Sequence, residues 1–159
     1  MKSRLLFAVI ILFFVSVTKA QQPAALPLFT FYKLDGKAVS NVNLKEGKKN
    51  LFILFDCTCD HCQRETKLLN TNYTAFKDVN IYMVTLDEAY IIPKFFDSYA
   101  KGLNNKPNVT VLQDKKQMFI PNFLPSMYPA MYLYSPQGKL LAYNAGDGGV
   151  KKMLKTLKK

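Results

Sequence analysis

The sequence predicts a single α/β domain with a central mixed β-sheet, an N-terminal β-hairpin and flanking helices. Residues 51–55 (LFILF) are apolar at every position, and residues 79–86 (VNIYMVTL) are a second run of strand length, so both are predicted to be strands buried on both faces. Between them, apolar residues recur at helical spacing. Strand, helix and strand in this order predict a βαβ unit with a right-handed crossover.

The other elements are predicted in order along the chain. Residues 28–34 are rich in aromatic residues, and the following Asp35-Gly36 is a strong signal for a hairpin turn. The helix after the first buried strand is expected over 59–76. The later predicted elements are a helix over 89–103 with Pro93 in its first turn, a strand at 109–113, one helical turn within 115–124, strands at 130–135 and 139–144 joined by Pro136-Gln137-Gly138, and a C-terminal helix with Val150, Leu154 and Leu157 on one stripe.

The first twenty residues have the pattern of a secretory signal peptide. Lys2 and Arg4 precede an apolar run that extends to Val17, and Ala20 is the expected last residue before cleavage. The run is shorter than the roughly 20 residues that a membrane-spanning helix needs. We therefore predict a signal peptide at 1–20 and a domain at 21–159, located in the periplasm or otherwise exported.

The chain is basic, with a formal net charge of +11. Cleavage after Ala20 would remove three basic residues (Lys2, Arg4 and Lys19) and no acidic one, which leaves +8. The lysines are scattered, which favours a solvated surface over an anionic-membrane contact. No basic run is interleaved with stacking aromatic residues, so we expect no nucleic-acid partner. We expect a monomer.

The most informative segment is FDCTCDHCQ (55–63), which places Cys57, Cys59 and Cys62 beside the only histidine, His61. An oxidising compartment would favour a disulfide. Cys57 is expected at the strand end, and Cys59 and Cys62 form a C-x-x-C pair, so any bridge is expected between Cys59 and Cys62. Such a bridge closes a very short loop and adds little stability, which favours redox chemistry over a structural role.

The position of the pair at a strand-to-helix junction predicts how it reacts. Cys59 would lie where unsatisfied N–H groups and the positive end of the helix dipole stabilise a thiolate, which is the nucleophilic form. Cys62, one turn later, could attack the mixed disulfide that Cys59 forms with a substrate. Between them, a protonated His61 would favour the Cys59 thiolate and Asp60 would oppose it, so both are candidate redox-tuning residues.

These residues resemble the thioredoxin-like fold, and in particular the exported TlpA/ResA-type thiol-disulfide oxidoreductases. The resemblance rests on LFILFDCTCDHCQRE (51–65) and SMYPAMYLYSPQGKLLAY (126–143) and extends over almost the whole of 21–159. It implies a three-layer sandwich, a cis Pro129 that faces the cysteines, and a groove at Tyr128 and Pro129 for an extended substrate. It also implies protein thiols and disulfides as substrates, a membrane electron donor, a reductase direction and no cofactor.

Other interpretations remain open. Cys57, Cys59, Cys62 and His61 could together bind or deliver copper or zinc, although the chain has no second, distant histidine. Peroxide reduction on the same fold is a second enzymatic alternative. Cys57 could be a buried small residue or an exchanging thiol. The oxidising surroundings and His61 are also compatible with an oxidase.

Overall fold

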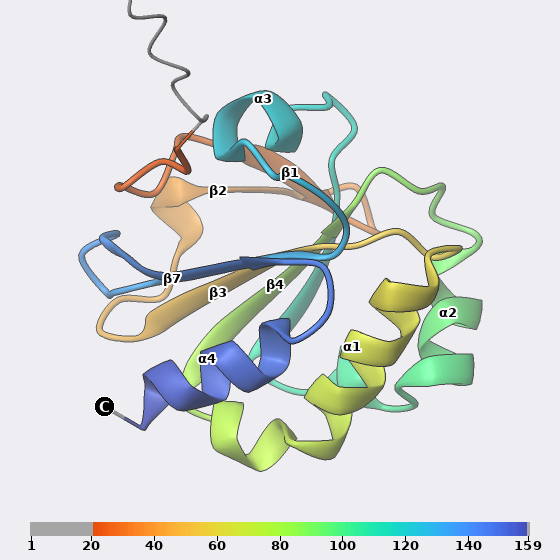
Figure 1. Cartoon of the computed structure of the whole chain (residues 1–159). Coiled ribbons are helices and arrows are strands. Elements are labelled where there is room, and N and C mark those ends of the chain that lie inside the picture. The colour runs from red at the N-terminus through yellow and green to blue at the C-terminus, as the bar shows by residue number, and fades with distance from the viewer. Residues whose placement is uncertain (1–20, 159) are drawn as a thin grey trace, which may run out of the picture.

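Seven strands form one mixed sheet in the computed structural model, which describes residues 21–158 (Figure 1). The predicted signal peptide lies outside these residues. The order of the strands across the sheet is β2-β1-β5-β4-β3-β6-β7. Their bounds are β1 Thr30–Lys33, β2 Ala38–Ser40, β3 Lys49–Leu54, β4 Val79–Thr85, β5 Val109–Gln113, β6 Ala130–Tyr134 and β7 Leu140–Ala145.

The centre of the sheet is parallel and its flanks are antiparallel. β3, β4 and β5 run parallel, while β6 pairs antiparallel with β3 and β1 pairs antiparallel with β5. The helices are α1 Asp60–Thr71, α2 Ile92–Tyr99, α3 Phe119–Phe123 and α4 Gly149–Leu157. Since α1 connects β3 to β4, the predicted βαβ unit and the α/β class with a mixed sheet are confirmed.

Each face of the sheet is covered by its own layer, which confirms the three-layer arrangement (Figure 1). Helices α1, α2 and α4 cover one face, where Ile53, Met83 and Leu133 lie in the core. On the other face, α3 and the segment before β1 cover a cluster dominated by aromatic residues: Phe29, Phe31, Phe52, Tyr82, Phe119, Phe123, Tyr132 and Tyr134. None of the described helices is long and apolar enough to cross a membrane.

Element boundaries differ from the sequence predictions where polar side chains bond to the backbone. Asn72 ends α1 early because its side-chain amide donates to Leu68 O at 2.8 Å, the carbonyl that its own backbone N–H reaches at 3.1 Å. The predicted single helix is therefore α1 followed by a short 3-10 helix, Tyr73–Phe76. β3 begins at Lys49, two residues before the predicted strand at 51–55, because buried Asn50 accepts a hydrogen bond from the Asn80 amide at 3.0 Å.

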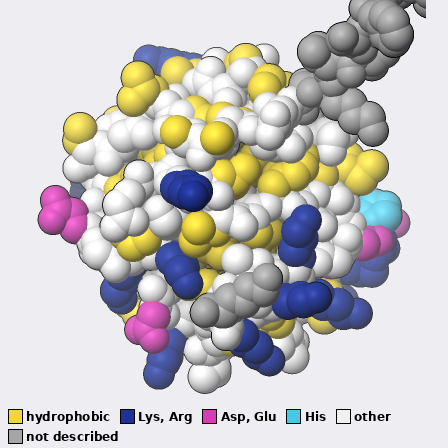
Figure 2. All heavy atoms as spheres, turned by 60° about the vertical axis from the view of Figure 1, so that its left-hand side comes forward, with side chains coloured by type: hydrophobic (Ala, Val, Ile, Leu, Met, Phe, Trp, Pro, Cys, Tyr) yellow, Lys and Arg dark blue, Asp and Glu magenta, His cyan; other side chains and the backbone are white. Residues whose placement is uncertain are grey.

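The positive charge is not gathered into one stripe on the face of the molecule drawn in Figure 2. On the face drawn in Figure 2, Lys and Arg side chains are spread between hydrophobic patches, and acidic side chains are few. On this face the lysines are scattered, as they are along the sequence.

Candidate active site

Cys59 begins helix α1. β3 ends at Leu54, and a turn leads to Cys59, which is the N-cap residue of α1 and is half-buried. The Cys59 N–H donates to Asp56 O at 3.3 Å, and Cys59 O accepts the first helical hydrogen bond, from the Gln63 N–H at 3.0 Å. The thiol therefore lies at the electropositive end of α1, where the sequence analysis expected it.

Cys62 occupies the first turn of the same helix and is completely buried. Burial is the main cause that raises the pKa of its thiol, and a hydrogen bond with Cys59 raises it further. The Asp56 N–H, 3.4 Å from the Cys62 sulfur, acts in the opposite direction. The two thiols of the pair are thus adjacent but different: one is partly accessible and the other is shielded and held in its protonated form.

Cys57 is not placed as the sequence predicted. The expectation of a strand end is wrong, because β3 stops three residues earlier and Cys57 lies in the turn that follows. Its N–H donates to Asp87 Oδ2 at 2.7 Å. Burial, and then a hydrogen bond of the thiol to Asp87, raise the pKa of Cys57. The residue lines a cavity of about 330 Å³ together with Ile91, Phe95 and Tyr99 of the α2 region.

Asp87 is a site residue to which the sequence analysis gave no role. It follows β4, whose Val84 lies beside Leu54 in the parallel register, so the ends of both strands meet at one edge of the sheet. The same carboxylate oxygen that holds Cys57 accepts a hydrogen bond from Thr85 Oγ1 at 2.8 Å. An acidic residue directly after the neighbouring strand was the signal that could have identified it.

Asp60 and His61, the predicted tuning residues, are both exposed at the start of α1. His61 Nδ1 lies 2.7 Å from Asp147 Oδ2 and 2.7 Å from an Arg64 guanidinium nitrogen. One ring nitrogen cannot donate to Asp147 and accept from Arg64 together, so the two contacts belong to different states of the imidazole. His61 and Arg64 hold the pKa of Asp147 below its ordinary value.

The segment that carries Asp147 is tied to α1 at a second point. Glu65 is buried on α1, and its two carboxylate oxygens accept hydrogen bonds from the Gly148 and Val150 N–H groups, both at 2.8 Å. Gly146 N–H, in the same segment, donates to Pro129 O at 2.8 Å. The loop before α4 therefore connects the cysteine helix to the proline segment, which local sequence patterns did not indicate.

Tyr128 and Pro129 lie directly before β6 and are joined by a cis peptide bond. Ala130, the next residue, lies opposite Leu54 in the β3–β6 register, which brings this segment to the edge of the sheet where the cysteines lie. Burial, and then the nearby Asp56 and Cys62, raise the pKa of Tyr128. Across residues 21–158, the backbone of Tyr128 forms no hydrogen bond with another backbone group.

The four candidate metal ligands do not form a common site. Over the described part of the chain, no three His, Cys, Asp or Glu side chains are arranged to hold a metal ion. Cys57 faces Asp87, whereas His61 faces Asp147 and Arg64 on the exposed side of α1. The metal interpretation therefore has no support from the geometry.

Known proteins resemble this chain in both sequence and fold. The sequence model of the AhpC/TSA family matches residues 23–143. A relative from Bacillus thuringiensis (strain Al Hakam), named thiol-disulfide oxidoreductase ResA, is 30% identical over 92% of this chain and 90% of its own length. The counterpart from Bacillus cereus carries the same name and is 28% identical over the same shares.

Solved structures agree in fold. DsbF of MTB, described in mixed oxidised and reduced forms, superposes with a TM-score of 0.69 at 22% identity, covering 87% of this chain and 98% of that one. StoA from Bacillus subtilis gives 0.62 at 17% identity, covering 84% and 98%. A peroxiredoxin-like protein from Aquifex aeolicus gives 0.64 at 15% identity, covering 87% and 86%, so the fold alone does not separate these activities. The family match and the full-length relatives place this chain in the AhpC/TSA family, as a redoxin of the TlpA/ResA type.

Proposed function

We propose that the protein is an exported thiol-disulfide oxidoreductase that uses Cys59 as nucleophile and Cys62 as resolving cysteine. The observation that carries the proposal is the asymmetry of the pair: Cys59 is half-buried at the helix end, and Cys62 is fully buried one turn later. A substrate can reach the first sulfur but not the second. The oxidoreductase activity also agrees with the names of the full-length relatives.

The exchange proceeds in two steps that balance. The Cys59 thiolate attacks one sulfur of a substrate disulfide, the substrate S–S bond breaks, and the other substrate sulfur leaves as a thiolate. Cys62 then loses its proton to solvent and attacks the Cys59 sulfur. The mixed disulfide breaks, a Cys59–Cys62 bond forms, and the substrate leaves with both sulfurs reduced by two electrons in total.

Tyr128 and Pro129 are proposed to hold the substrate during this exchange. The unpaired backbone N–H and C=O of Tyr128 can bond to an extended polypeptide in the manner of an added strand. Pro129 is buried, and its carbonyl is already bonded to Gly146, so it gives the groove a fixed wall. This arrangement favours a protein substrate over a small disulfide.

We propose that residues 1–20 are a cleaved signal peptide and that the domain over 21–159 acts outside the cytoplasm as a monomer. The pattern of charge, apolar run and small residues before Gln21 supports cleavage after Ala20. In the periplasm a reductase needs a source of electrons, and a membrane donor is the proposed partner.

The deciding experiment is capture of the mixed disulfide. Cys62→Ser removes the resolving thiol, so reaction with oxidised insulin should leave a covalent adduct, and mass spectrometry should map it to Cys59. Cys57→Ser should instead turn over insulin at close to the wild-type rate. Absence of an adduct with Cys62→Ser, or an adduct at Cys57, would contradict the assignment of Cys59.

A further inference from the structure

The sheet has a gap on one side of β5. β1 pairs with β5 at only two positions, Tyr32↔Gln113 and Lys33↔Leu112, before the chain turns into the β1–β2 hairpin. β4, on the other side, pairs with β5 along its whole length. Residues 109–111 of β5 therefore have no strand partner on the β1 side.

Hydrogen-bonding groups of the backbone point into this gap. Ile81 N–H donates to Asn108 O at 2.8 Å, and in a parallel ladder with this register the N–H and C=O groups of Val109 and Val111 point away from β4. Val109 N–H is bonded to Lys106 O at 3.0 Å. Among residues 21–158, no backbone hydrogen bond outside the strand ladders reaches the Val111 N–H or the carbonyls of the two valines. They are the groups that an added strand would use.

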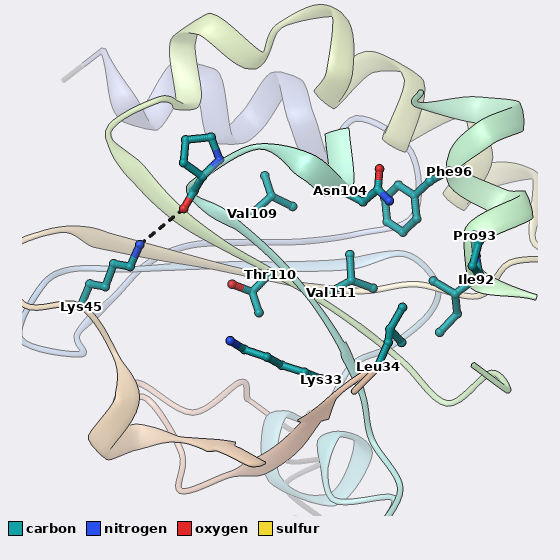
Figure 3. Close-up of a pocket in the computed structure, with 11 residues that line it drawn as sticks. Lys33, Leu34, Lys45, Ile92, Pro93, Phe96, Asn104, Val109, Thr110 and Val111 are labelled. Carbon is teal, nitrogen blue, oxygen red and sulfur yellow. Dashed lines mark hydrogen bonds between the residues drawn. The ribbon is translucent and has the colours of Figure 1, made fainter. Parts of the chain in front are cut away.

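A cavity of about 450 Å³ lies beside the gap (Figure 3). Its apolar side is formed by Ile92 and Phe96 of α2, which lie on one side of Val109 and Val111, and Lys33 and Lys45 lie on the other side (Figure 3). A second cavity, of about 220 Å³, shares Lys33, Lys45 and Thr110 with the first. The two cavities are thus parts of one opening at the unpaired half of β5.

The charge around the opening has one sign. Lys33, Lys37 and Lys45 line it, and no acidic side chain lines either cavity. Lys37 has an ion-pair partner, Asp35, at 3.3 Å. Lys45 Nζ donates only to a carbonyl, Pro107 O at 3.4 Å, which leaves its charge available to an anion.

We propose that this opening is a docking site for an extended, acidic segment of a partner protein, which would add a short strand to β5. The segment would bond to Val111, place an apolar side chain against Ile92 and Phe96, and set carboxylates beside Lys33 and Lys45. A second copy of this chain is disfavoured because it would bring the same lysines to the contact. Residues 1–20 are disfavoured because they contain basic residues and no acidic one. The site is independent of the cysteine pair and of the proposed function.

The test uses a fluorescein-labelled heptapeptide, EVEIEVE, titrated with the wild-type protein while fluorescence anisotropy is measured. We expect saturable binding that weakens as NaCl is raised from about 50 to about 500 mM. Lys33→Glu and Lys45→Glu should each weaken binding about tenfold, because each reverses a charge next to a carboxylate. Lys151→Glu, an exposed change on α4, is the matched control and should bind as wild type. All three variants should still reduce insulin, which separates this site from the redox function.

Two further probes test the mode of binding. The peptide EVEPEVE lacks the central N–H and should bind more weakly, and the Val111 amide should exchange hydrogen more slowly in the presence of EVEIEVE. The proposal is overturned if KVKIKVK binds as well as EVEIEVE, if neither lysine reversal changes the affinity, or if the proline peptide binds equally. Binding of laurate but not of the peptide would also overturn it and assign the opening to small anionic amphiphiles.

Discussion

His61 has two alternative partners at a single ring nitrogen. Protonated, its Nδ1–H can donate to Asp147, and neutral, the same nitrogen can accept from Arg64. Because His61 lies between the two cysteines, the side chain that bonds to His61 also determines the position of the imidazole relative to Cys59. We therefore infer that Asp147, 86 residues from His61 in sequence, positions the imidazole beside the proposed redox pair.

The titration of Asp147 should report this contact. Its pKa is lowered first by the hydrogen bond from His61 and then by that from Arg64. Because the pKa of Asp147 is lower in the folded protein, this contact stabilises the fold at pH values above the unfolded-state pKa. The stabilisation is lost as the pH falls through the folded-state pKa. In an NMR titration we expect a midpoint below the ordinary 3.8, and His61→Ala should move it upward.

Asp35 serves as the internal control in this titration. Its pKa is also lowered, chiefly by the hydrogen bond from the Lys37 N–H, so it should not respond to His61→Ala. An unchanged Asp147 midpoint in His61→Ala would show that the ring does not engage the carboxylate in solution.

Tyr134 and Tyr132 make a matched pair for stability. Both are completely buried, but Tyr132 donates to Phe123 O at 2.9 Å, whereas the Tyr134 hydroxyl is the one buried side-chain polar group over residues 21–158 without a partner. Tyr134→Phe should raise the free energy of unfolding by about 1 kcal/mol, and Tyr132→Phe should lower it by about 1 kcal/mol. Urea denaturation measures both, and equal effects of the two changes would contradict this explanation.

At the scale of elements, α1 and α4 are joined through one buried carboxylate. Glu65→Ala would leave the Gly148 and Val150 N–H groups without their acceptor, so we expect a loss of about 3 kcal/mol in the free energy of unfolding. Asn70→Ala, a change on the same helix, should cost less than about 1 kcal/mol. Urea denaturation of both variants distinguishes them. Similar losses would mean that the carboxylate is replaceable by water.

Elements with a strong local signal were predicted, and contacts between distant segments were not. The runs at 51–55 and 79–86 identified the central strands because a strand buried on both faces must be apolar throughout. The C-x-x-C spacing at a strand-to-helix junction is also a local signal, and it placed the cysteine pair at the start of α1. Pro129 was proposed only through the resemblance to the TlpA/ResA-type proteins. Asp87 and Asp147 meet the site only because separate loops converge on it in the fold, and no periodicity in the sequence records that convergence.

At the scale of the whole molecule, the fold determines where the proposed active site lies but not the direction of electron flow. His61 and the electropositive helix end favour an oxidising couple, while the resemblance noted in the sequence analysis and the proposed membrane donor favour a reductase. Equilibration of the Cys59/Cys62 pair with glutathione buffers measures the reduction potential. We expect a value near about −270 mV, like that of thioredoxin, and a value near about −120 mV would show an oxidase instead.

The loop over 146–150 bonds to the proline segment at one end and to the cysteine helix at the other. Displacement of α4 should therefore disturb the proline segment and the cysteine helix at once, and these are the two sides of the proposed substrate groove. We therefore expect a fusion partner or truncation near Lys159 to lower the proposed activity, and a purification tag is better placed before Gln21 in a protein that lacks residues 1–20.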